Sequence, residues 1–78
     1  MPTIFKIKNF RFFFFSNEGS EPFHIHVESD EKYAKFWLKP IELSSNWGFK
    51  SHELNEIKEI LFQNQQLIEE RWYEFFKS

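Results

Sequence analysis

The sequence predicts an α+β domain in which a small antiparallel sheet precedes a helical C-terminal segment. Residues 3–38 contain four apolar or alternating segments separated by short polar stretches, which is typical of strands and turns. From residue 51 onward, apolar residues recur instead at three- and four-residue spacing, which is typical of an amphipathic helix. We therefore expect a mainly antiparallel four-stranded sheet, a β-hairpin followed by two strands. One long or two shorter C-terminal helices should pack on one of its faces.

The first two strands are expected at residues 3–7 and 10–15. They should form a hairpin across Lys8-Asn9, because asparagine tolerates the positive φ that a tight turn requires. The second strand is aromatic on both faces, and only Arg11 interrupts it. An unbroken apolar run predicts a strand that is covered on both sides, so we expect it to lie centrally in the sheet.

Residues 16–22 have the composition of a loop, and their final proline disfavours a helix before it. The third strand is expected at residues 23–28 and the fourth, which alternates apolar and polar residues, at residues 32–39. Pro40 should end the fourth strand because proline cannot donate a ladder hydrogen bond.

Residues 41–43 are expected to add only a short extension to the sheet before a polar turn over residues 44–48. At 78 residues the chain is the size of one small domain. We therefore predict a single domain over residues 1–78, with the sheet in residues 1–43 and the helical part in residues 49–77.

Ser51 is the expected N-cap of the helical part, with Glu53 in the first turn, where the helix dipole favours a carboxylate. Polar Asn64 interrupts the apolar stripe that continues to Phe76. A continuous helix over residues 51–76 would be about 39 Å long. A compact domain of this length has a radius of gyration of only about 11–12 Å. We therefore expect a break near Asn64 in preference to a helix that projects toward another chain.

Strand alternation predicts which side chains share a face of the sheet. One set should face the helix: Phe23, Ile25, Val27, Ala34, Phe36 and Leu38. The opposite face should carry His24, His26, Tyr33, Lys35 and Trp37, together with Arg11. Two of the three histidines of the chain thus point the same way. Because imidazoles titrate near neutral pH, such a pair can transfer protons or bind a metal.

Several functions fit this face. A metal-independent ribonuclease or phosphotransferase would use His24 and His26 as its candidate catalytic acid and base. It would also need cations and platforms for stacked bases, and the candidate binding residues are Arg11, Lys35, Trp37 and Tyr33. The same aromatic-rich face could instead anchor a protein partner, or have a purely structural role. A metal site would need a third ligand such as Glu28 or His52, whose approach nothing in the spacing fixes, so no metal and no cofactor are expected.

Composition restricts the partners. The chain has no cysteine, so disulfides and thiolate zinc sites are excluded. Its net charge of −2 argues against nucleic-acid binding by bulk electrostatics, although the basic residues concentrate in the N-terminal half. A small core without covalent staples and an aromatic content of 22% predict a homo-oligomer or an obligate heterocomplex, with Phe13 and Phe15 or the Trp72–Phe76 end in the contact. Without a membrane-spanning or secretion-signal pattern, we expect a cytoplasmic protein that does not contact a membrane.

Several segments in order resemble a known family: residues 1–5, 10–18, 22–27, 34–38, 47–49, 53–57 and 72–76. Together they are similar to the bacterial and archaeal family called domain of unknown function 4160, and the likeness covers nearly the whole chain. Phe23 departs from the family pattern, which usually has Pro-Pro-His-Xaa-His where this chain has Glu21-Pro22-Phe23-His24-Ile25-His26. The resemblance carries over no catalytic residue.

The resemblance implies a short protein that is often encoded beside a second small protein, domain of unknown function 2442, in arrangements similar to toxin–antitoxin modules. We therefore expect one component of such a pair, which binds a small cognate protein, with RNA as a further candidate ligand.

Overall fold

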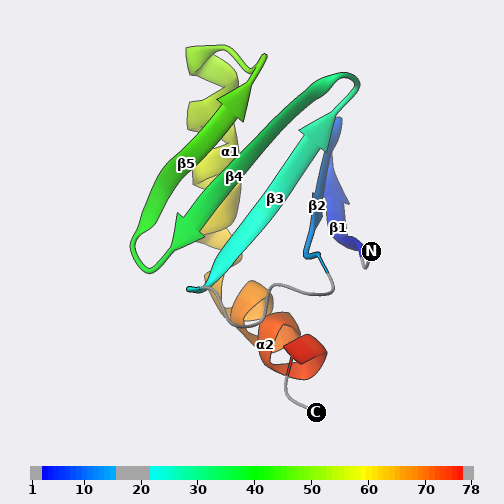
Figure 1. Ribbon diagram of the computed structural model, residues 1–78, viewed down its shortest axis with the longest axis vertical. Coiled ribbons are helices and arrows are strands. Elements are labelled where there is room, and N and C mark those ends of the chain that lie inside the picture. The colour runs from blue at the N-terminus through cyan, green and yellow to red at the C-terminus, as the bar shows by residue number, and fades with distance from the viewer. Residues whose placement is uncertain (1–2, 16–21, 77–78) are drawn as a thin grey trace.

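The computed structural model describes residues 3–15 and 22–76 of the chain. Its sheet has the strand order β1-β2-β3-β4-β5, and every neighbouring pair is antiparallel. The elements are β1 (Thr3–Ile7), β2 (Phe10–Phe13), β3 (His24–Ser29), β4 (Lys32–Leu38), β5 (Ile41–Trp47), α1 (Ser51–Gln63) and α2 (Gln65–Phe76). Helix α1 lies behind the sheet and α2 lies beyond the end where β3 begins (Figure 1). The predicted α+β class is thus confirmed.

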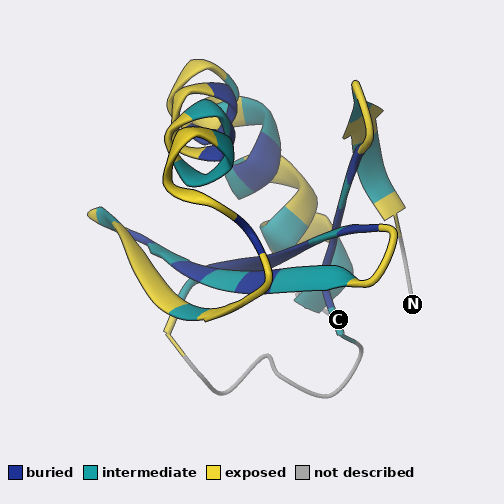
Figure 2. Ribbon diagram, turned by 90° about the horizontal axis from the view of Figure 1, so that it is seen from above, coloured by how far each residue is buried: buried dark blue, intermediate teal, exposed yellow. Residues whose placement is uncertain are grey.

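The predicted number of strands was wrong, because β5 is a full strand and not a short extension followed by a turn. Its register with β4 runs from the pair Leu38 and Ile41 to the pair Tyr33 and Trp47. Residues 44–46 are polar, so the sequence shows no apolar alternation there. Most of β5 is exposed, as Figure 2 shows. An exposed edge strand can carry polar residues on both faces, because neither face has to fit into the core. The sheet therefore reaches Trp47, beyond its predicted limit.

The turns differ from expectation in one detail. In the β1–β2 turn, Lys8 has a φ of 57°, whereas the sequence suggested that Asn9 would take the positive φ. Asp30 has a φ of 55° in the β3–β4 turn. Gly48 follows β5 with a φ of 97°, and a Cβ at this position would lie 3.2 Å from Cγ of Lys32. Glycine is therefore favoured at position 48 both by the positive φ and by the lack of space for a Cβ beside Lys32.

The hydrophobic core lies between the sheet and the helices. The predicted helix-facing residues of β3 and β4 are buried there: Ile25, Val27, Ala34, Phe36 and Leu38. The helices contribute Ile57, Ile60, Leu61 and Ile68. Burial of each such side chain stabilises the fold by about 1.5–3 kcal/mol.

The central position predicted for β2 is confirmed. This strand lies between β1 and β3 and is buried on both faces. Phe12 belongs to the core on the helix side, and Phe13, which points to the other face, is also buried. Phe13 is therefore packed within the chain, although the sequence suggested it as a contact to another molecule.

The helical segment breaks at Asn64, as we favoured. The Nδ2 of Asn64 donates to the carbonyl oxygen of Ile60 at 2.8 Å, and its main-chain N–H donates to Leu61 at 3.2 Å. The N–H of Ile68 then donates to the carbonyl oxygen of Asn64 at 3.0 Å as α2 begins. Because of this break, α2 turns across the end of the sheet, where Trp72 lies 5.1 Å from the ring of Phe14.

The start of α1 was placed one residue too late, because Lys50 is the N-cap and Ser51 is already helical. Glu53 accepts a hydrogen bond from the main-chain N–H of Lys50 at 2.8 Å. A carboxylate at the third helical position thus binds a free amide at the helix start. Together with a hydrogen bond from Lys32, this bond holds the pKa of Glu53 below its ordinary value.

Three ion pairs join the sheet and its turns to the helices: Lys8–Glu56, Lys32–Glu53 at 2.7 Å and Lys39–Glu69 at 2.6 Å. Each pair combines a lysine of the basic N-terminal half with a glutamate of the acidic C-terminal half. The uneven charge of the sequence is therefore balanced in part between the two layers, and less of it remains available to a charged ligand.

Candidate functional site

The candidate site is the sheet face opposite α1, which we call the outer face. The strand registers arrange its side chains in three rows. The first row is Lys6, Arg11, Glu28, Tyr33 and Trp47. The second row is Phe13, His26, Lys35 and Ser45, and the third is His24, Trp37 and Glu42. All six residues that the sequence proposed for the site thus share this face, and their roles stay predictions.

His26 lies at the centre of the outer face and is only 1% exposed. Its ring stacks on Phe13 at 5.4 Å and meets Phe15 edge-on at 4.4 Å. On the other side it stacks on Tyr33, whose hydroxyl shares a hydrogen bond of 2.5 Å with Nδ1 of His26. Tyr33 lies diagonally across the β3–β4 pair from His26, a position that a long aromatic side chain can span.

His24 is also 1% exposed and lies two residues before His26 on the same face of β3. Its Nδ1 donates to the carbonyl oxygen of Pro22 at 2.7 Å, so this nitrogen carries a proton. Trp37 and Trp72 flank the ring at 5.8 and 5.3 Å. His24 therefore contacts both the neighbouring strand and α2.

The two imidazole rings lie 5.1 Å apart and nearly perpendicular to each other, inside a layer of aromatic side chains. A general acid or base must reach the proton that it transfers, directly or through one water molecule. Rings that are 1% exposed do not meet this condition from the solvent side. In this arrangement His24 and His26 act first as packing residues, and a catalytic role stays a prediction.

The accessible part of the outer face surrounds the buried histidines. Trp47 is 60% exposed and packs on Tyr33 at 5.4 Å. Lys35 places its Nζ 4.6 Å from the ring centre of Trp37, within the range of a cation–π contact. These groups combine apolar area with positive charge at the surface, which suits recognition of another molecule.

Arg11 contributes less free charge than the sequence suggested. It forms an ion pair with Glu28, its neighbour in the first row. Its Nε also donates to Oγ1 of Thr3 at 2.8 Å, and its guanidinium lies 4.5 Å above the ring of Phe13. The side chain is thus held in place over the aromatic layer.

Sequence reasoning missed three residues of this site: Trp47, Trp72 and Phe13. Trp47 was assigned to a turn, because the polar residues before it concealed β5. Trp72 was identified only as a core or binding residue of the helix, and its place beside His24 depends on the break at Asn64. Strand parity could have identified Phe13, which has the same parity as Arg11 in β2.

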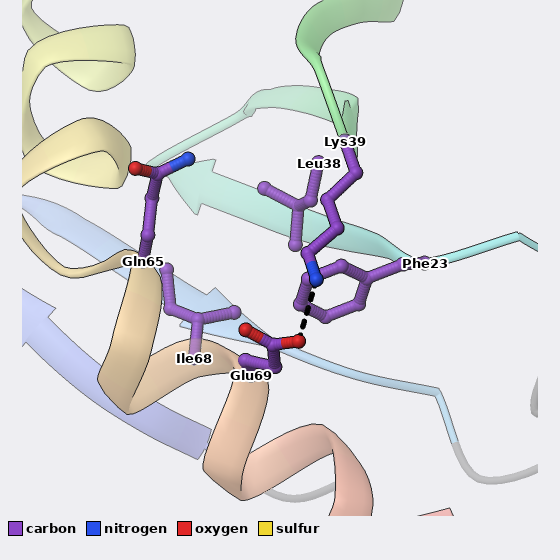
Figure 3. A pocket seen from close by; sticks show the side chains of 6 residues that line it. All are labelled: Phe23, Leu38, Lys39, Gln65, Ile68 and Glu69. Atoms are coloured by element: carbon purple, nitrogen blue, oxygen red, sulfur yellow. Dashed lines mark hydrogen bonds and ion pairs between the residues drawn. The ribbon is translucent and has the colours of Figure 1, made fainter.

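A small cavity of about 20 Å³ lies between the β4–β5 turn and α2 (Figure 3). Its lining residues are Phe23, Leu38, Lys39, Gln65, Ile68 and Glu69. The hydrogen bond and the charge of Glu69 raise the pKa of Lys39 above its ordinary value. A cavity of this size holds about one water molecule, so this contact attaches α2 to the sheet and does not accommodate a substrate.

A larger and more open hollow of about 450 Å³ lies between the β1–β2 and β3–β4 turns. Its charged residues have both signs: Lys6, Lys8, Arg11, Glu28 and Asp30. Lys8 and Arg11 already form ion pairs, so the hollow does not concentrate charge of one sign.

The described residues do not supply the third ligand that a metal site at the histidine pair would need. Within residues 3–15 and 22–76, no three metal-ligating side chains form a group that could hold an ion. His52 lines a separate hollow near the start of α1. In the same part of the chain, neither helix has the length and apolar character needed to cross a membrane.

A family model described as Domain of unknown function (DUF4160) matches residues 9–73. This match covers β2 to β5, α1 and most of α2, and therefore includes the histidine pair and the aromatic residues around it. No curated protein and no solved structure is significantly similar to the chain.

Proposed function

The chain belongs to the DUF4160 family, and we propose that it binds a small cognate protein as one component of a pair similar to toxin–antitoxin modules. One observation carries this proposal. The groups best suited to catalysis, His24 and His26, are 1% exposed, whereas aromatic and cationic groups around them reach the surface. The family resemblance supplies the pairing, and the outer face supplies a surface suited to it.

The accessible residues have the chemistry of a protein contact. Tryptophan, tyrosine and arginine are the residues that most often dominate binding energy at interfaces. On the outer face, Tyr33, Trp37 and Trp47 form an aromatic surface, and Lys35 lies beside them. The aromatic layer beneath is packed, so binding would cost little side-chain ordering.

RNA is the less favoured ligand. Bases could stack on Tyr33, Trp37 and Trp47, but single-strand binding usually relies on a positively charged groove. Lys8, Lys32 and Lys39 form ion pairs with helix glutamates, and the net charge of the chain is −2. An RNA-cleaving role would in addition require access to His24 and His26.

The test is co-expression with the products of the flanking genes, followed by co-purification and calorimetric titration. Trp47→Ser should weaken the complex by roughly 30-fold, the effect of losing about 2 kcal/mol at an interface hot spot. Tyr73→Ser is a matched control, because Tyr73 on α2 is 63% exposed and Trp47 is 60% exposed. The control should bind like the unmodified protein.

The proposal fails if no flanking gene product binds, or if the two variants weaken binding equally. Titration of a fluorescent single-stranded RNA into the purified chain tests the other ligand in parallel. RNA binding that Trp47→Ser weakens, without any protein partner, would replace the proposed function with RNA recognition.

A further inference from the structure

The two edge strands of the sheet differ in how they are protected against pairing with another strand. Natural edge strands are usually shortened, bulged or given lysines, which discourage edge-to-edge association. Strand β1 has five residues, includes Lys6 and is irregular between Thr3 and Phe5. Strand β5 has seven residues and no lysine, and in the described part of the chain it pairs only with β4. Its protection is limited to one irregularity of register and the charge of Glu42.

Apolar side chains lie next to this open edge. Leu43 of β5 is 39% exposed and Phe62 of α1 is 65% exposed. A hollow of about 260 Å³ separates α1 from the edge, and its lining includes Ile41 and Phe62. Helix α1 packs beside β5, and Figure 2 shows exposed residues along both elements. The edge thus offers unpaired main-chain groups beside a hollow that is lined by both apolar and charged residues.

We propose that β5 pairs antiparallel with β5 of a second copy of this chain. The two sheets would then form one continuous sheet with two-fold symmetry, and both α1 helices would lie side by side on the same face. Each copy would cover Leu43, Phe62 and the hollow of the other. This assembly is independent of the proposed function, because the occupant is a second copy of the chain.

The charges on α1 identify the second copy as the occupant. Lys58 and Glu59 line the hollow and lie midway between Asn55 and Phe62, which line it as well. If the two α1 helices run antiparallel about a two-fold axis at this point, Lys58 of each copy faces Glu59 of the other. The contact therefore contains two equivalent ion pairs, as a self-complementary dimer interface requires. Glu59 accepts a hydrogen bond of 2.9 Å from Nε2 of Gln63, which is an uncharged donor.

The dimer leaves the outer face uncovered, because α1 packs on the opposite side of the sheet. Residues such as Trp37 and Lys35 would stay accessible to a cognate protein in both copies. Dimerisation and partner binding can therefore be tested separately, and the failure of one does not imply the failure of the other.

The test combines light scattering with a charge-reversal series. The unmodified chain should have twice the mass of a single chain of 9.7 kDa. Lys58→Glu and Glu59→Lys should each weaken the dimer by roughly 10- to 30-fold, because each turns two attractive pairs into repulsive ones. An equimolar mixture of the two variants should dimerise again, since every opposed pair then joins a lysine and a glutamate. Lys6→Glu reverses an exposed charge on the other edge strand and should leave the dimer intact.

A mass of 9.7 kDa for the unmodified chain at high micromolar concentration would overturn the proposal. So would variants that dissociate alone but do not dimerise when mixed, because they would show that the two charges do not face each other. Dissociation by Lys6→Glu would overturn it as well, since it would place the contact on the other edge. All variants should keep the circular dichroism of the parent, since the three positions are exposed. A chain that stays monomeric alone and forms a complex only with a flanking gene product would likewise overturn the dimer, while leaving the proposed function in place.

Discussion

Replacement of His26 by alanine tests whether the histidine pair is structural. The side chain is 1% exposed and contacts the rings of Phe13, Phe15 and Tyr33. Removal of a large buried side chain leaves a cavity and typically costs about 2–5 kcal/mol. The Tyr33 hydroxyl would also lose the hydrogen bond to Nδ1, a loss of about 1 kcal/mol or more. We therefore expect His26→Ala to lower the free energy of unfolding by about 3–5 kcal/mol.

A loss of this size is easily measured in a chain of 78 residues. Each kilocalorie per mole shifts the melting temperature of such a small domain by about 4–8 °C, so the expected fall is at least roughly 12 °C. Thermal unfolding followed by circular dichroism provides the measurement. His52→Ala is the matched control, because His52 is exposed on α1 and its loss should change stability by less than about 0.5 kcal/mol.

His26→Phe separates ring packing from hydrogen bonding, because it keeps a ring in the aromatic layer and removes the hydrogen bond to Tyr33. This variant should be destabilised less than His26→Ala. The structural reasoning is refuted if His26→Ala melts within about 2 °C of the parent. If that variant also lost RNA cleavage by about 10²–10⁴-fold, the histidine would be a general acid or base.

Further predictions concern the core and the ion pairs. Ile57→Ala removes a fully buried side chain and should cost about 2–5 kcal/mol, seen as a lower urea midpoint with an unchanged slope; an unchanged midpoint would contradict the core assignment. Because the pKa of Glu53 is lowered, its stabilisation is complete above the unfolded value of about 4.3 and is lost as the pH falls through the folded pKa. As the pH falls, Glu53→Gln should therefore lose less free energy of unfolding than the parent, as measured by urea unfolding at several pH values. Equal losses in the two proteins would argue against the Lys32 contact. The pKa of Lys39 is raised, so its stabilisation is complete below 10.5 and is lost as the pH rises through the folded pKa. Lys39→Met should therefore be less stable than the parent at neutral pH and equally stable at a pH above the folded pKa of Lys39. A difference that persisted at that high pH would not come from the ion pair with Glu69.

The sequence by itself determined the faces of the sheet and the division of the helical segment. Both depend on local periodicity, which any strand or helix must obey wherever it lies in the fold. Alternation along β3 and β4 was sufficient to place Phe36 in the core and Lys35 on the outer face. In the same way, Asn64 marked the helix break, because a polar side chain interrupts the apolar stripe and bonds to its own main chain.

Only the tertiary structure decided that β5 exists as a full strand. Its residues 44–46 show no apolar pattern, because an edge strand with exposed sides does not need one. The main-chain pairing with β4 forms it, and this pairing places Trp47 beside Tyr33. Main-chain hydrogen bonds depend little on side-chain type, so no periodicity in the sequence indicates them.

The tertiary structure also decided the character of the histidine pair and of the charged surface. Strand parity placed His24 and His26 together, but Trp72, which is distant in the sequence, covers His24 only after α2 has turned across the sheet. Likewise, the basic character of the N-terminal half could be counted in the sequence, whereas the pairing of Lys39 with Glu69 depends on the docking of α2. Burial and ion pairing join residues that are remote in the chain, so packing of the whole domain determines them and local pattern does not.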